Sequence, residues 1–177
     1  MADFPGVAFD LPHAHLSTVG ICSIAGQAAM LENSTPGVAT WPAANRAIYV
    51  PVVVQVPITV RKMAFEVAVQ SGNCDVGIYD SSLKRLVSKG STAVAAAGTQ
   101  IIDIVDTALT PGVYFLAMCV DNTTASVGRV PLGLINSRAS GVSQQAVGAV
   151  TLPDPAVLAA PGTAYLPVLI ATGVATI

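Results

Sequence analysis

The sequence has few charged residues, and this scarcity sets the first limits on what the protein does. Only 10% of its 177 residues are charged, 53% are hydrophobic and the mean hydropathy is +0.65. A typical soluble protein has about 25% charged residues. A chain of this length forms one domain, whose core cannot bury so much apolar sequence. Although many of these residues are small alanines, we predict that part of the surface contacts other chains.

The chain also lacks the features of nucleic-acid-binding and membrane proteins. Its net charge is −2, and the basic pairs at residues 61–62 and 84–85 are isolated, so no basic surface for a nucleic acid is expected. Residues 156–177 carry no charge. Prolines and glycines interrupt this stretch and no basic residue flanks it, which disfavours a membrane span. We therefore predict neither a nucleic-acid nor a membrane partner.

Cysteines are few, odd in number and widely spaced: Cys22, Cys74 and Cys119. The N-terminus carries Asp3 and Asp10 and has no basic region of the kind that begins a signal peptide. Without an export signal, we expect all three cysteines to be unpaired in a chain made in the cytoplasm.

The spacing of the apolar residues that are present predicts β-strands. Residues 74–79 alternate, so that Cys74, Val76 and Ile78 point to one face and the residues between them to the other. Asp80, Ser81 and Ser82 follow as a turn, which makes an antiparallel return plausible over residues 83–88. This stretch is therefore predicted to form a β-hairpin.

Further strands are expected on both sides of this hairpin. Residues 59–70 alternate, whereas residues 47–57 contain two prolines, which favours an edge or bulged strand. Residues 100–105 and 164–171 are expected to be short strands. Residues 113–120 are apolar on both faces, which predicts a central strand covered twice, with Phe115 and Met118 buried on opposite sides.

These short strands, joined by turns rich in glycine, proline and asparagine, predict the fold class. The sequence contains no long helical period, so we expect an all-β protein, an antiparallel β-sandwich of jelly-roll type. Residues 1–40 lack a steady period and mix prolines and glycines with apolar residues. We interpret residues 1–40 as an extended N-terminal arm and residues 41–177 as the β-sandwich domain.

Residues suited to catalysis are sparse. His13 and His15 could bind a metal from one face of a strand, but this spacing is common by chance. Asp103 and Asp106 could act as paired carboxylates, yet they more simply mark a solvated strand face. The chain contains no nucleophile elbow, no phosphate-binding loop and few ways to build a triad. We predict no catalytic residue, no cofactor and no metal, so the chain is not expected to be an enzyme.

Two further places in the sequence could bind a ligand, residues 121–122 and Trp41. Asp121 and Asn122 follow the predicted central strand and could contribute to a calcium site, if oxygen ligands came from elsewhere. Trp41, the only tryptophan, could stack on a base or a sugar. It more often fills a core or an interface.

One run of sequence resembles a known family. The run DVGIYDSSLKRLVSKGST, followed by a strand and by LTPGVYFLAM, is similar to a β-sandwich pattern of bacteriophage virion proteins. That pattern has a V-G-I-Y-D strand end, a short turn, a strand closing in S-x-G, and then L-x-P-G-x-Y-x-L-A. The resemblance covers about residues 41–121 and includes head decoration (cement) proteins and modules of tails or fibres. It implies the fold rather than the place in the particle.

The segments outside this resemblance favour a subunit held in a larger shell. We therefore predict a structural virion protein that binds and stabilises an assembled phage capsid. Its expected partners are the major capsid protein or other virion subunits, and it is expected to form a homo-oligomer, a dimer or trimer. It would be located in the virion after assembly in the host cytoplasm. The predicted assembly contacts are Phe4, Phe9, Leu11, Leu16, Ile21 and Trp41.

The alternative is a phage tail or fibre module, or a host-adhesion module that binds carbohydrate. Such a module needs exposed aromatic residues beside polar groups, and aromatic residues make up only 5% of the chain. A hydrolase would need a convergent polar pocket, which the sequence does not suggest.

Overall fold

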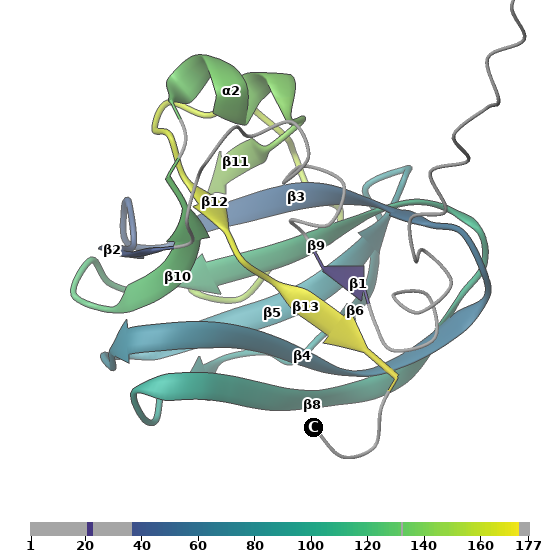
Figure 1. Cartoon of the computed structure of the whole chain (residues 1–177), viewed down its shortest axis with the longest axis horizontal. Helices are drawn as coiled ribbons and strands as arrows, with labels where there is room; N and C mark the ends of the chain where they lie inside the picture. The colour runs from purple at the N-terminus through teal and green to yellow at the C-terminus, as the bar shows by residue number, and fades with distance from the viewer. Residues whose placement is uncertain (1–20, 23–36, 132, 174–177) are drawn as a thin grey trace, which may run out of the picture.

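The computed structural model describes residues 21–22, 37–131 and 133–173, and these residues form a β-sandwich. Two antiparallel sheets, which we call sheet A and sheet B, pack face to face (Figure 1). The predicted all-β class and the antiparallel sandwich are confirmed. The jelly-roll type stays a prediction.

Sheet A is built around one long strand. That strand, β4, pairs with β8 along one edge and with β13 and β10 along the other. β13 also pairs with β1, and β10 with β2 and β12. The strands of sheet A are β1 (Ile21–Cys22), β2 (Gly37–Thr40), β4 (Ile58–Val69), β8 (Gly98–Leu109), β10 (Ser126–Val130), β12 (Leu166–Pro167) and β13 (Ile170–Thr172).

Sheet B has the order β11-β3-β9-β5-β6, and β7 also pairs with β5. β9 is central, as predicted, because β3 and β5 pair with it on either side. Met118 is fully buried between the sheets, whereas Phe115, on the opposite face, is only half-buried. The strands of sheet B are β3 (Arg46–Val54), β5 (Asn73–Asp80), β6 (Arg85–Ser88), β7 (Thr92–Ala93), β9 (Gly112–Val120) and β11 (Ser143–Ala146).

The main core lies between the two sheets, and every second side chain of the strands points into it. On β5 the inward residues are Cys74, Val76 and Ile78, the set that the sequence pattern predicts. The predicted hairpin turn is present as well. The carboxylate of Asp80 accepts hydrogen bonds from the amides of Ser82 (2.9 Å) and Lys84 (3.0 Å), which holds β5 and β6 together at the reversal.

A second, smaller core covers part of the outer face of sheet B. Residues 147–158, which we call the strap, contain no helix or strand and cross this face. Their amides and carbonyls bind β5 and the turn after it: Tyr79 donates to the carbonyl of Pro153, and the amide of Ala156 to the carbonyl of Leu83. The strap covers β5 on the side away from the main core. The buried residues of this second core are Ala47, Tyr49, Tyr79, Ala117, Cys119, Val150, Leu152 and Ala156.

Proline explains where two strands depart from the sequence-based expectation. The last strand, expected over residues 164–171, is divided into β12 and β13, which pair with different partners. Pro167 has no amide proton and cannot continue a ladder as donor. On β3, Pro51 lies beyond Tyr49, where pairing with β11 ends. β3 is thus an interior strand at its start and an edge strand at its proline.

One other strand is longer than the sequence indicates, and one helix was not predicted. β8 extends to both sides of the expected residues 100–105. A short helix, α2 (Leu134–Ala139), was not expected. Within the described residues, no helix has the length and apolar character needed to cross a membrane.

Candidate functional site

The paired carboxylates of β8 belong to a solvated surface. Asp106 Oδ2 lies 3.2 Å from Arg61 Nε, and Asp103 Oδ1 lies 3.8 Å from Lys62 Nζ. The two aspartate side chains are 61% and 79% exposed, respectively. Both acids therefore form surface ion pairs across the β4–β8 ladder, and the solvated-face interpretation holds for them.

The oxygens of Asp121 are already used to hold a turn. Asp121 Oδ2 accepts hydrogen bonds from the backbone and side-chain amides of Asn73, and Oδ1 accepts one from Asn122 Nδ2. Burial raises the pKa of Asp121, but hydrogen bonds from Asn122 and Asn73 outweigh this effect, so that the net pKa is lowered. The described part of the chain contains no group of three or more metal-binding side chains.

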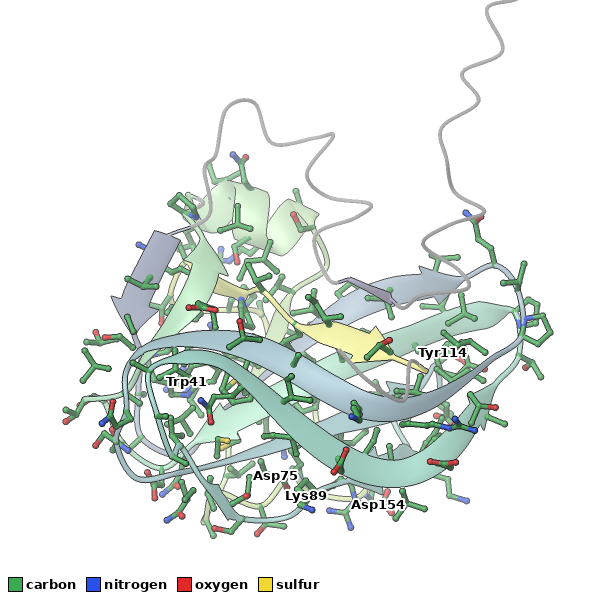
Figure 2. The ribbon with its side chains drawn as sticks, turned by 60° about the horizontal axis from the view of Figure 1, so that its bottom comes forward. Trp41, Asp75, Lys89, Tyr114 and Asp154 are labelled. Carbon is green, nitrogen blue, oxygen red and sulfur yellow. The ribbon has the colours of Figure 1, made fainter. Side chains whose placement is uncertain are left out.

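Asp75 of β5 carries a buried carboxylate that accepts three hydrogen bonds (Figure 2). Its side chain is fully buried. Oδ2 accepts hydrogen bonds from Ser88 Oγ at 2.7 Å and from the Leu152 amide at 2.8 Å, and Oδ1 accepts one from the Gly90 amide at 2.9 Å. Asp75 therefore ties the strap and the end of β6 to β5. The signal for this role that can be found in the sequence is an acidic residue within an otherwise apolar strand.

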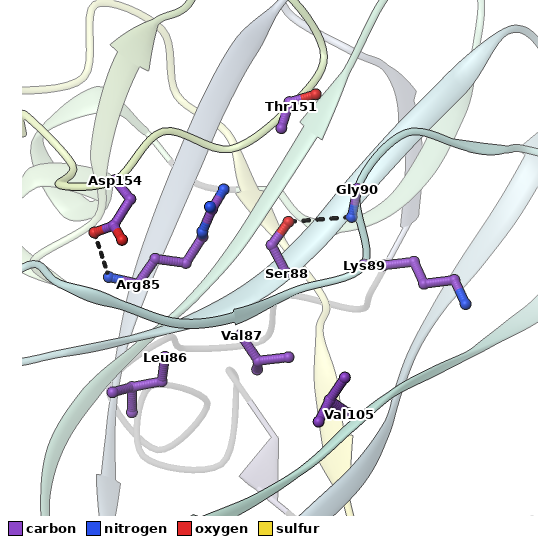
Figure 3. A pocket seen from close by; sticks show the side chains of 9 residues that line it. All are labelled: Arg85, Leu86, Val87, Ser88, Lys89, Gly90, Val105, Thr151 and Asp154. Atoms are coloured by element: carbon purple, nitrogen blue, oxygen red, sulfur yellow. Dashed lines mark hydrogen bonds between the residues drawn. The ribbon is translucent and has the colours of Figure 1, made fainter.

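A shallow open depression lies between β6, the edge strand of sheet B, and β8 of sheet A. Two of its charged side chains, Arg85 and Asp154, already form hydrogen bonds that hold the strap to β6. The Arg85 guanidinium donates to the carbonyl of Leu152, and the Arg85 amide donates to Asp154 Oδ1 at 3.1 Å (Figure 3). The depression offers no convergent catalytic set. It is lined by Arg85, Leu86, Val87, Ser88, Lys89, Gly90, Val105, Thr151 and Asp154.

Trp41 lies in the main core. Only 1% of it is exposed, its indole Nε1 donates to the carbonyl of Arg46 at 2.9 Å, and its ring meets the ring of Tyr165 edge to face at 5.2 Å. The side chain is labelled in Figure 2. A residue packed in this way offers no surface to another chain. The predicted assembly contact at Trp41 is therefore wrong, and its core role holds.

The predicted arm is described only in part. Phe4, Phe9, Leu11 and Leu16, together with both histidines, lie outside the described residues. Ile21 begins β1, whose backbone pairs with Ala171 of β13 in the same chain. The last residues of the predicted arm form β2, which pairs with β10. Sheet A therefore contains two pieces of the segment that the sequence assigns to the arm.

The described cysteines are inert core residues. Cys74 and Cys119 are free and fully buried. Burial raises the pKa of each thiol to about 12, with a smaller contribution from the nearby carboxylate of Asp75. A thiol with such a pKa forms almost no thiolate at neutral pH, and the thiolate is the nucleophile.

We therefore expect Cys74 and Cys119 to resist alkylation at pH 8 in the folded protein, and all three cysteines to react once it is unfolded in denaturant. Mass spectrometry of each cysteine-containing peptide measures this difference. The unfolded sample is the control for reagent quality. A mass shift on reduction, which would reveal a disulfide, or rapid labelling of Cys74 in the folded protein would contradict this prediction.

The part of sheet B that the strap leaves open forms an apolar surface. Three cross-strand pairs line the outer face of β3 and β9: Tyr49 with Ala117, Pro51 with Phe115, and Val53 with Val113. The first pair is buried and the second is half-buried. In the third pair, Val53 is 66% exposed and Val113 is 47% exposed. We call Pro51, Val53, Val113 and Phe115 the open end of sheet B.

This apolar surface is the candidate functional site, because the polar groups described above, Asp75, Asp121 and Arg85, are engaged in hydrogen bonds within the chain. Comparison with known proteins adds no assignment. No protein-family model matches the chain, and neither a curated protein nor a solved structure is similar to it. The sequence singled out the arm for assembly but did not identify the open end, although Pro51 to Val54 is an unbroken apolar run.

Proposed function

We propose that this chain is a structural virion protein that binds and stabilises an assembled phage capsid through apolar contacts. The observation that carries the proposal is the open end of sheet B, where two valines directly opposite each other, Val53 and Val113, are 66% and 47% exposed. A cross-strand apolar pair gains free energy when another surface removes it from water, at about 25 cal/mol per Å² of apolar surface. The partner would be the major capsid protein or another virion subunit.

The resemblance to phage virion proteins supports the same proposal. The residues that carry it form the β5–β6 hairpin and the central strand β9, which are neighbours in sheet B. The open end belongs to this sheet. Stabilisation would follow from mass action: a subunit that binds the assembled shell more tightly than its separate components shifts the equilibrium toward the shell.

The tail, fibre or adhesion alternative has less support from the described residues. Carbohydrate-binding surfaces need exposed aromatic rings, but Trp41, Tyr49, Tyr79 and Tyr165 are buried. Tyr114 is half-buried, and its hydroxyl donates to the carbonyl of Thr110. The described part of the chain therefore presents no platform of aromatic rings.

The test compares phage particles made with and without this protein. We expect purified particles to contain it, and particles that lack it to release their genome at a lower temperature. Adsorption to host cells should be unchanged in particles that remain intact. Particles of unchanged heat stability would overturn the proposal. If such particles also failed to adsorb, or if the protein bound defined glycans on an array, the adhesion alternative would hold.

A further inference from the structure

The outer face of sheet A, on the side away from the main core, is the second large surface of the sandwich. Because Met63, Phe65 and Val67 of β4 point into the main core, the residues between them point outward. The two core clusters of the described chain lie elsewhere, one between the sheets and the other under the strap on sheet B. Within the described residues, no apolar cluster of this kind covers the outer face of sheet A.

A row of apolar side chains crosses this outer face. The strand register places Ala64 of β4 between Ile170 of β13 and Ile101 of β8. Ile101 is 42% exposed and Ile170 is 38% exposed, and neither belongs to a core cluster. Ala64 itself is buried, so the row has a small residue at its centre and a larger apolar one on each side. Covering this row would remove apolar surface from water.

The charged residues on the two sides of the row have opposite signs. Glu66 lies two residues after Ala64 on β4 and Lys62 two residues before it, so all three share one face. Lys62 Nζ lies 3.8 Å from Asp103 Oδ1. The exposed carboxylate of Glu66 accepts a hydrogen bond from Thr99 Oγ1 at 3.0 Å, and no lysine or arginine of the described chain forms an ion pair with it. A carboxylate without a cation therefore lies across the apolar row from a lysine.

This pattern is complementary to itself under a two-fold rotation. An axis along the apolar row lays the outer faces of two copies on each other with their β4 strands reversed. The row of one copy then meets the same row of the other. Glu66 of each copy faces Lys62 of the other, because both residues lie two positions from Ala64, on opposite sides. Such a contact has the closed symmetry of C2 dimers, and opposite charges across it favour this orientation.

The outer face is also large enough for a specific contact. β4 and β8 have twelve residues each, which gives a length of about 40 Å, and three paired strands are about 15 Å wide. Two copies would bury on the order of 600 Å² each, or about 1,200 Å² in total, which is at the lower end of the range for stable interfaces. Face-to-face packing of two sheets is a common arrangement in proteins.

We propose that two copies of this chain form a symmetric dimer through the outer faces of their sheets A, with the row of Ile101, Ala64 and Ile170 at its centre. This contact gives the predicted homo-oligomer a surface. It does not depend on the proposed virion role, since it concerns the isolated protein. The open end lies on the outer face of sheet B, on the other side of the sandwich, so the dimer leaves it accessible to a further partner.

The test is the oligomeric state of the full-length protein, measured by sedimentation velocity over a roughly hundredfold range of concentration. We expect an equilibrium between monomer and dimer. Ile101→Asp should weaken dimerisation at least about tenfold, because it places a charge in the apolar row. Val105→Asp is the matched control: Val105 is 76% exposed on the same strand but lines the depression beside β6, and its substitution should leave dimerisation unchanged.

Charge reversal tests the orientation of the two copies. Glu66→Lys alone places lysines opposite each other on both sides of the row, and Lys62→Glu alone places glutamates there, so each variant should dimerise at least about tenfold more weakly. A mixture of the two variants should form a heterodimer about as stable as the wild-type dimer, because the new lysine of one copy meets the new glutamate of the other. Native mass spectrometry identifies the heterodimer when one variant is labelled with nitrogen-15.

Three results would overturn the proposal. The first is a wild-type protein that stays monomeric over the whole concentration range. The second is a dimer that Ile101→Asp and Glu66→Lys leave unchanged, or that Val105→Asp weakens equally, since the contact would then lie on another surface. The third is a mixture of the charge-reversed variants that stays monomeric. Particle stability is a separate measurement, so the proposed function can fail while the dimer holds, and the reverse.

Discussion

Replacing Asp75 by alanine should lower the free energy of unfolding by on the order of 4 kcal/mol, because it removes the acceptor of three hydrogen bonds, one of them fully buried. The hydroxyl of Ser88 and the amides of Gly90 and Leu152 all donate to this fully buried carboxylate. The strap, which holds the second core on sheet B, should loosen first. Denaturant unfolding, followed by circular dichroism or tryptophan fluorescence, measures the loss.

Two further variants separate hydrogen bonding from general damage. Asp75→Asn keeps an oxygen that can accept from Ser88 and Leu152 but turns its NH₂ group toward the Gly90 amide, so we expect an intermediate loss. Asp103→Ala is the matched control, since its carboxylate is 79% exposed, and it should change stability by less than about 0.5 kcal/mol. An Asp75→Ala protein as stable as the control would show that the carboxylate is not the acceptor on which the strap depends.

Deleting residues 1–20 should leave a folded β-sandwich that no longer joins phage particles. The strands of both main layers, β3, β4, β5, β8 and β9, lie far outside the deleted segment, so a cooperative melt and a β-rich spectrum should persist. The deleted segment contains Phe4, Phe9, Leu11 and Leu16, which we propose to contact neighbouring virion subunits. The amount of protein on purified particles, relative to the full-length chain, measures attachment.

The end point of this deletion follows from the structure. Ile21 starts β1, which pairs with β13 in sheet A, so a deletion that includes Ile21 would remove part of a strand. A truncated protein that fails to fold would show that the segment belongs to the core. Full occupancy on particles would instead place attachment elsewhere, and the open end of sheet B would be the next surface to test, by Val113→Asp in the full-length chain.

Much of the fold follows from local patterns. Alternation in residues 74–79 identified the inward side chains of β5, and Asp80 with the two serines after it identified the turn. The run at 113–120 identified the central strand. The prolines of β3 indicated a strand edge but could not show that β11 stops at Tyr49 and leaves only the second half of β3 open. Such a boundary depends on the length of a partner almost a hundred residues away in the chain.

The candidate site was far less predictable. The arm was selected for its apolar composition and Trp41 for its chemistry, yet Trp41 is enclosed by Tyr165 and the backbone of Arg46. The open end was missed because Val53 and Val113 have the same alternation as buried strand residues. Nothing in their neighbouring sequence distinguishes a covered face from an uncovered one.

The sequence by itself determined the all-β class, the strand faces and the turns, because these depend on interactions between residues close together in one strand or hairpin. Only the tertiary structure decided which outer face is covered. A strap without regular secondary structure covers part of the outer face of sheet B, and Asp75 holds it through a hydrogen bond from Leu152, a residue 77 positions away. Periodicity describes the residues of one strand, whereas the coverage of a face depends on segments that are distant in the sequence. The open end of sheet B, which those segments leave exposed, is the surface that we propose for a partner.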